Sequence, residues 1–182
     1  CANISINSRI NCFCFQTALS DKKEEELYFT NYDFNRENNF GGMSFLRNKK
    51  SNTTVKANVD TLDNKFPELK RLNLLKADAE GMEINIIKGG IDLIKRTKPF
   101  LYLENEPGFQ KSKELIELLW SLEYRVFWHI MPYYSINNFF KNPNNIFKNL
   151  QHSNIIGVSK DREIHTDLKE VKDSSYHPKK YQ

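Results

Sequence analysis

Three acidic side chains follow one another closely where an apolar segment of the chain ends. Asp78, Glu80 and Glu83 come directly after the segment 72–77, and Glu104 ends a second apolar segment further along. An ionised carboxylate at the buried end of a strand is costly unless it is paired or used. Two such groups on one rim could take the proton of a hydroxyl group or hold a divalent cation through oxygen ligands.

Helix capping is the simpler alternative for some of these acids. Asp78 or Glu80 could cap a helix that begins near Gly81, an effect worth about 0.5–2 kcal/mol. An acid in the first helical turn is usual, so capping is the simpler interpretation of Glu83. Asp78 and Glu104 differ, because both stand at the last buried position of an expected strand. These two residues favour chemistry over capping.

The apolar pattern predicts an α/β fold with a doubly wound open sheet. Strands are expected at 10–19, 26–31, 54–63, 72–78, 99–106, 124–131 and 152–160, and helices at 80–96 and 110–123. The strand–helix–strand–helix–strand order over 72–131 indicates parallel strands joined by crossover helices. Ligands of such sheets bind outside the carboxyl ends of the strands. Asp78 and Glu104 are therefore expected to meet at the binding edge.

Composition and charge exclude some classes of function. The 182 residues suit one domain, and the net charge of +4 is spread among acids without a basic stripe, which argues against nucleic-acid binding. No apolar run approaches the roughly 20 residues of a membrane span. The segment 161–182 is charged and aperiodic, so a domain at 1–160 followed by a mobile tail is expected.

The cysteines indicate a reducing compartment. Cys1, Cys12 and Cys14 have no zinc-site spacing, and their odd number argues against a disulfide framework. Cys12 and Cys14 would lie on one face of the strand expected at 10–19. Reduced, buried thiols and a cytoplasmic location are therefore predicted.

Two further features allow alternative interpretations. His129 ends an expected strand and could act as a base, although a single histidine is more often structural. The segment 129–149 is rich in aromatic and amide side chains, as a sugar-binding lip would be. A loop held by asparagine turn chemistry explains the same composition equally well.

The segment 61–106 resembles the core of the FkbM family of S-adenosylmethionine-dependent methyltransferases. The residues that carry the resemblance are Thr61, Leu62, Asp63, Lys76, Asp78, Glu80, Gly81, Glu83, Gly89, Pro99 and Glu104. Weaker likeness at 15–21, 40–45, 142–147 and 153–158 extends it over about residues 3–160. The resemblance implies a Rossmann-like class I methyltransferase sheet and O-methylation of a sugar, glycan or secondary metabolite.

The resemblance also implies roles for particular residues. Catalysis falls to Asp78, Glu80 and Glu104, and contact with S-adenosylmethionine to Asp78 and Ala18. Glu83, Asn105 and His129 would contact the acceptor. If Mg²⁺ is used, Asp78 and Glu104 would hold it. The acceptor and the oligomeric state stay open.

The chain departs from the family at the donor site. The family binds its donor at a glycine-rich turn after the first strand, and none of the seven glycines here forms such a turn. Two strand–helix units, about 60 residues in all, are therefore expected to be missing ahead of this segment. The chain alone would then be inactive. The alternative is a non-catalytic remnant that serves as a glycan-binding or partner-docking module.

Overall fold

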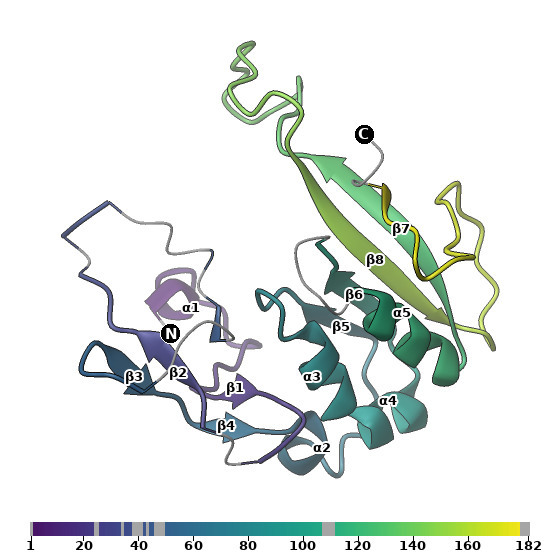
Figure 1. Cartoon of the computed structure of the whole chain (residues 1–182), viewed down its shortest axis with the longest axis horizontal. Helices are drawn as coiled ribbons and strands as arrows, with labels where there is room; N and C mark the ends of the chain where they lie inside the picture. Colours follow the sequence, from purple (N-terminus) through teal and green to yellow (C-terminus); the bar gives the residue numbers. More distant parts are fainter. Residues whose placement is uncertain are drawn as a thin grey trace.

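The sheet that carries the acidic residues has four strands in the order β5-β6-β8-β7 (Figure 1). A computed structural model describes residues 2–23, 26–33, 35–37, 42, 44–45, 50–106 and 112–178. The strands are β5 (Leu74–Ala77), β6 (Phe100–Glu104), β7 (Tyr124–Pro132) and β8 (Gln151–Ser159). β5 and β6 are parallel, and β8 runs antiparallel to both β6 and β7. β5, β6 and β7 therefore share one direction, and their carboxyl ends share one edge.

Helices connect these strands and cover one face of the sheet. α3 (Glu83–Lys88) and α4 (Ile91–Thr97) lie between β5 and β6 in the chain, and α5 (Ser112–Ser121) lies between β6 and β7. Leu101 and Leu103 of β6 are fully buried in one cluster with Ile87, Ile94 and Leu119 of the helices. The alternate residues Tyr102 and Glu104 are only half-buried, since successive strand residues point to opposite faces.

The mixed α/β class is confirmed, with one difference in strand order. The strand–helix–strand–helix–strand order expected over 72–131 is present, and β5 pairs with β6 in parallel. β7 is not the neighbour of β6, because β8 lies between them. Among the described residues, no helix combines the length and the apolar character that a membrane crossing needs.

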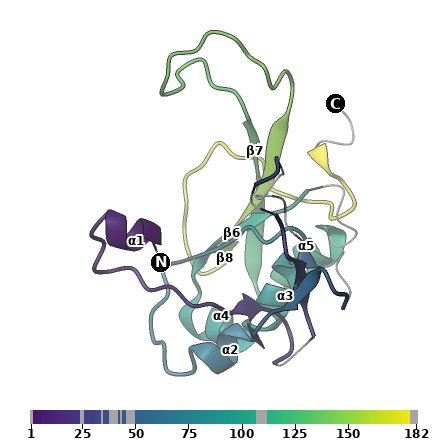
Figure 2. The same ribbon diagram turned by 90° about the vertical axis from the view of Figure 1, so that its left-hand side faces the viewer.

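The described residues in the first part of the chain form two small sheets and two short helices. Parallel strands β1 (Ala18–Leu19) and β4 (Val59–Asp60) make one sheet, and antiparallel strands β2 (Tyr28–Thr30) and β3 (Thr54–Lys56) make the other. The helices are α1 (Ala2–Ile6) and α2 (Leu62–Lys65), and Figure 2 shows α1 on the outside of the molecule.

The segment Thr61–Asp63 has a structural role at two helix starts. The Thr61 hydroxyl oxygen accepts from the backbone N–H of Asn64 at 3.1 Å and caps α2. The Asp63 carboxylate accepts from the N–H groups of Asp92 and Leu93, at 3.1 and 2.7 Å, in the first turn of α4. Such caps satisfy amides that have no partner within the helix.

The prediction of a buried strand at 10–19 is wrong for most of its length. Only Ala18 and Leu19 form a strand, and Phe13 is 80% exposed. Cys12 and Cys14 are exposed free thiols, not buried ones. The aromatic pattern of this segment suits a strand. Among the described residues, however, only Ala18 and Leu19 pair with another strand, β4.

The strand expected at 72–78 forms, but it is not fully buried. β5 is the edge strand of its sheet, and Leu74 is 56% exposed. An edge strand loses the cover of a neighbour on one side, so apolar residues alone do not guarantee burial.

The segment after Asp161 is packed over part of its length, in contrast to the mobile tail that its charge predicts. The N–H of Trp128 donates to the carbonyl of Lys169 at 2.9 Å, and the N–H of Val171 donates to that of Val126 at 2.8 Å. Val171 and His177 are buried. Backbone pairing with β7 and these two side chains outweigh the polar composition. The domain boundary at 160 stays a prediction.

Gly89 provides a test of how the β1 region docks on the main sheet. A Cβ at Gly89 would overlap the carbonyl oxygen of Ser20, while its backbone conformation suits alanine. Gly89→Ala should therefore lower the free energy of unfolding by about 1–3 kcal/mol through overpacking. Urea unfolding measures this loss. Lys88→Ala, at an exposed neighbouring position, should change it by less than about 0.5 kcal/mol. Equal stability of the two variants would contradict the contact.

Candidate functional site

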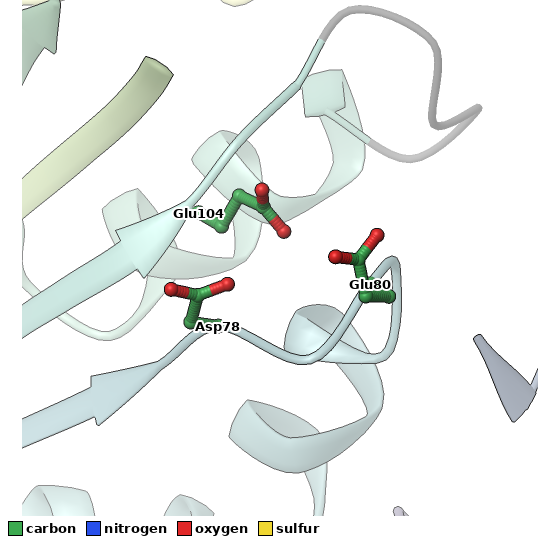
Figure 3. Close-up of side chains that lie close together, drawn as sticks. All are labelled: Asp78, Glu80 and Glu104. Carbon is green, nitrogen blue, oxygen red and sulfur yellow. The ribbon is translucent and has the colours of Figure 1, made fainter. Parts of the chain in front are cut away.

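Three carboxylates converge at the carboxyl edge of the four-stranded sheet. Asp78 follows β5, Glu104 ends β6, and Glu80 lies in the loop between β5 and α3. One carboxylate oxygen from each of the three residues can be chosen so that all three lie within 4.8 Å of one another. Figure 3 shows the three side chains turned toward a common space. The parallel pairing of β5 and β6 thus brings together Asp78 and Glu104 as expected, and the loop adds Glu80.

The loop that carries Glu80 has an unusual backbone. Glu80 has φ 51° and Gly81 has φ 98°, both in the left-handed region that favours glycine. This backbone conformation is unfavourable for a glutamate, so contacts with neighbouring residues must stabilise it. The Ser44 hydroxyl donates to the carbonyl of Glu80 at 2.7 Å.

Glu83 holds the same loop from the other side. Its Oε1 accepts from the N–H of Ala79 at 2.6 Å and its Oε2 from the N–H of Gly81 at 3.1 Å. Burial raises the pKa of Glu83, and the two backbone bonds partly offset that rise. Both carboxylate oxygens are therefore engaged with the loop, which favours the capping interpretation of Glu83. Contact between Glu83 and an acceptor stays a prediction.

Glu104 is the acid whose protonation is most affected by the site. Burial, reinforced by the charges of Asp78 and Glu80, raises the pKa of Glu104 to about 7. Its Oε2 is buried and has no hydrogen-bond partner among the described residues. A carboxyl that titrates near neutral pH suits proton transfer, because both protonation states are then populated.

Lys76 compensates part of the negative charge. Its Nζ lies 2.8 Å from a carboxylate oxygen of Asp78, and both side chains are about half-exposed. A pair this exposed contributes little stability. The positive charge of Lys76 therefore offsets part of the negative charge of the three carboxylates.

The arrangement suits a proton, a cation or a positively charged ligand group. Three convergent carboxylates are hard oxygen ligands of the kind that Mg²⁺ and Ca²⁺ prefer. Glu80 would be a third ligand beside the expected pair Asp78 and Glu104. The closest pocket, lined by Gly81, Glu83, Glu104 and Asn105, has a volume of about 10 Å³ and admits no more than one water molecule.

Asn105 and His129 lie near the acids in different ways. Asn105 is buried, and its backbone carbonyl accepts from Nε2 of His177 at 2.8 Å. His129 lies across β8 from Glu104, since both residues are in register with Asn154. Its Nδ1 is 2.9 Å from the hydroxyl of Tyr102. Contact of these two residues with an acceptor stays a prediction.

Ala18 belongs to a different sheet from the acids. It lies in the wall of a pocket of about 300 Å³ between the two small sheets, together with Phe29, Phe45 and Asn58. The neighbouring Asp21 accepts from the side-chain amide of Asn85 in α3 at 2.9 Å, and this bond lowers the pKa of Asp21. The Ala18 segment is thus tied to the helix that follows the acid loop.

Sequence reasoning missed the residues that hold the end of β6. Ser153 donates its N–H to Glu106 at 2.7 Å and accepts from the N–H of Asn105 at 2.8 Å. Its hydroxyl is 3.3 Å from Nε2 of His177. No periodic pattern marks His177, because it reaches the sheet from an irregular segment.

The family model of the methyltransferase FkbM domain matches residues 3–126, which is more than half of the chain. No curated protein and no solved structure matches. The matched segment contains β5, β6 and all three convergent acids and ends within β7.

Glu83→Gln tests the two hydrogen bonds by which Glu83 holds the loop between β5 and α3. Glutamine keeps one acceptor but turns an N–H₂ group toward a backbone N–H, so one buried amide loses its partner. The free energy of unfolding should fall by about 1–3 kcal/mol in urea unfolding. The matched variant Glu80→Gln leaves both backbone bonds in place and should change stability by less than about 0.5 kcal/mol. A larger loss in Glu80→Gln than in Glu83→Gln would reverse this assignment.

The raised pKa of Glu104 predicts a pH-dependent stability. The folded pKa of about 7 exceeds the ordinary value of 4.5, so the folded protein binds this proton more tightly than the unfolded chain. The corresponding stability is present below pH 4.5 and is lost as the pH rises through about 7. Glu104→Gln lacks this loss. Between pH 4.5 and 7 the melting temperature of the original protein should fall relative to that of the variant. Parallel pH profiles would contradict the shift.

Proposed function

Because the chain belongs to the FkbM methyltransferase family, we propose that it takes part in methyl transfer from S-adenosylmethionine to a hydroxyl group of a sugar, glycan or secondary metabolite. The observation that carries the proposal is the convergence of Asp78, Glu80 and Glu104, with the pKa of Glu104 at about 7. Such a group can accept a hydroxyl proton at neutral pH.

Glu104 is the proposed proton acceptor. S-adenosylmethionine supplies a methyl group on a positively charged sulfur. With the donor bound, the Glu104 carboxylate would accept the proton of the acceptor hydroxyl as that oxygen displaces the sulfur at the methyl carbon. Orientation of the hydroxyl by the surrounding site would supply much of the rate.

Asp78 and Glu80 are proposed to bind positive charge and orient the reactants. Their carboxylates face the same space as Glu104, so a sulfonium or amino group there would offset the repulsion among the acids. The donor's adenosine part is proposed to contact Ala18, whose pocket of about 300 Å³ lies within the range of ligand sites. Asn105 and His129 remain candidates for contact with the acceptor.

The glycine-rich donor turn is proposed to come from two further strand–helix units. No Gly-x-Gly or Asp-x-Gly-x-x-x-Gly pattern occurs in the chain. Among the described strands, β5 has one partner, β6, and its other edge is available for pairing. The strand order β5-β6-β8-β7, with one antiparallel strand inserted near the end, supports a Rossmann-like methyltransferase sheet. Without such units the chain would be a glycan-binding or partner-docking remnant.

The test is methyl transfer by the complete gene product. Radiolabelled S-adenosylmethionine and a panel of sugar and glycan hydroxyls serve as substrates. Asp78→Asn and Glu104→Gln should each lower the rate by about 10²–10⁴-fold, because each removes a carboxylate at the reacting centre. Glu114→Gln, at an exposed position of α5, is the control and should retain activity.

Two outcomes would redirect the proposal. Glycan binding without any methyl transfer would favour the remnant. Loss of activity in EDTA, with recovery on adding Mg²⁺, would favour a cation on Asp78 and Glu104. We expect activity to survive the chelator, because Glu104 can take the proton without a metal.

A further inference from the structure

The loop between β7 and β8 projects away from the rest of the molecule. Residues 133–150, here called the β7–β8 loop, extend beyond the strands in both views (Figures 1 and 2). The loop lies outside the segment that matches the family model. Phe139 is 91% exposed, Phe140 is 87% exposed and Ile146 is 75% exposed. Clustered exposed apolar side chains on a small domain usually mark an interaction surface.

Asparagine side chains give this loop an ordered backbone. The Asn138 amide donates to the carbonyls of Ser135 and Asn142, at 3.0 and 2.8 Å, and its oxygen accepts from the N–H of Asn142 at 3.0 Å. The Tyr134 hydroxyl donates to the same Asn142 carbonyl at 3.0 Å. Internal bonding of backbone groups lowers the cost of taking a loop out of water. These bonds give several backbone groups of the loop partners within it, while its large apolar side chains remain exposed.

The base of the loop is fixed by aromatic stacking. The Tyr133 ring stacks on Phe147, with centroids 5.9 Å apart, and lies 3.9 Å from the ring of His152. The N–H of Tyr133 also donates to the carbonyl of Leu150 at 2.9 Å. The loop is therefore anchored to both strands at the point where it leaves the sheet.

The β7–β8 loop itself carries charge of one sign. From Tyr124 to Lys160 the sequence contains no aspartate or glutamate, although the whole chain has 23 acidic residues. The basic residues of the loop itself are Lys141 and Lys148. Aromatic and aliphatic side chains beside lysines suit an anionic bilayer surface, where rings enter the interface and ammonium groups meet lipid headgroups.

We propose that the β7–β8 loop docks the protein on the surface of an anionic lipid bilayer. Phe139, Phe140 and Ile146 enter the interface, and Lys141 and Lys148 contact the headgroups. A glycan fits less well, because the side-chain amide of Asn138 and the side-chain oxygen of Asn142 are already engaged within the loop. A protein partner is also disfavoured, since a stable protein interface buries about 1,200–2,000 Å² and this loop is a narrow projection.

The β7–β8 loop begins at the edge of the sheet that carries the acids. β5, β6 and β7 run in one direction, so the loop leaves the same edge at which Asp78 and Glu104 lie. Burial, followed by the charges of Glu106 and Glu104, raises the pKa of Tyr133 at the loop base. The docking itself does not depend on methyl transfer.

Vesicle binding tests the proposal with the purified protein. Flotation is measured with vesicles of phosphatidylcholine alone and of phosphatidylcholine mixed with phosphatidylglycerol. The protein should bind the mixed vesicles, and added salt should weaken this binding. The double variant Phe139→Ser/Phe140→Ser should weaken it by about tenfold or more. Lys141→Gln/Lys148→Gln should reduce the preference for anionic vesicles.

Control variants distinguish docking through the β7–β8 loop from non-specific adsorption to vesicles. Phe13→Ser changes an exposed aromatic side chain far along the chain and should leave binding unchanged. Circular dichroism checks that the loop variants keep their fold. Absence of vesicle binding, or binding that the phenylalanine variant does not affect, would overturn the proposal. Sedimentation measures self-association of the same variant. If Phe139→Ser/Phe140→Ser abolishes self-association while vesicle binding persists, the loop joins two copies of the chain and the proposal is overturned.

Discussion

Parallel pairing of β5 with β6 is the constraint on which the acid site depends. It places the residue after β5 beside the last residue of β6, so Asp78 and Glu104 share an edge although they are far apart in sequence. Bringing carboxylates together in a half-buried site costs free energy, and the raised pKa of Glu104 is the direct expression of that cost. The same repulsion makes the site receptive to a proton or to positive charge.

The surrounding structure holds the carboxylates in place against this repulsion. Glu83 binds two amides of the acid loop, and Ser44 binds the Glu80 carbonyl. At the other strand, Ser153 and His177 fix the backbone that follows Glu104. His177 belongs to the segment after 161. A part of the chain beyond the family match therefore contributes to the site.

The sequence predicts much of the site because strand ends are local features. Apolar runs that end in acids identified Asp78 and Glu104, and their pairing followed from the strand–helix–strand order. Glu80 was also named from the sequence, but its convergence with the other two acids depends on a left-handed backbone that no sequence pattern predicts. The strand expected at 10–19 and the burial of β5 failed for one reason, because both depend on neighbouring strands. His177 was missed because only tertiary packing brings it to the sheet.

If the three carboxylates act as one electrostatic unit, removal of one charge must change the pKa of another. An NMR titration of the Glu104 side-chain carboxyl carbon tests this most directly, in the original protein and in Asp78→Asn. We expect a pKa of about 7 in the original protein and a lower pKa in the variant, because Asp78 is the charge that raises it most after burial. A Glu104 pKa near its ordinary value of 4.5, unchanged by Asp78→Asn, would show that the carboxylates do not act as one unit.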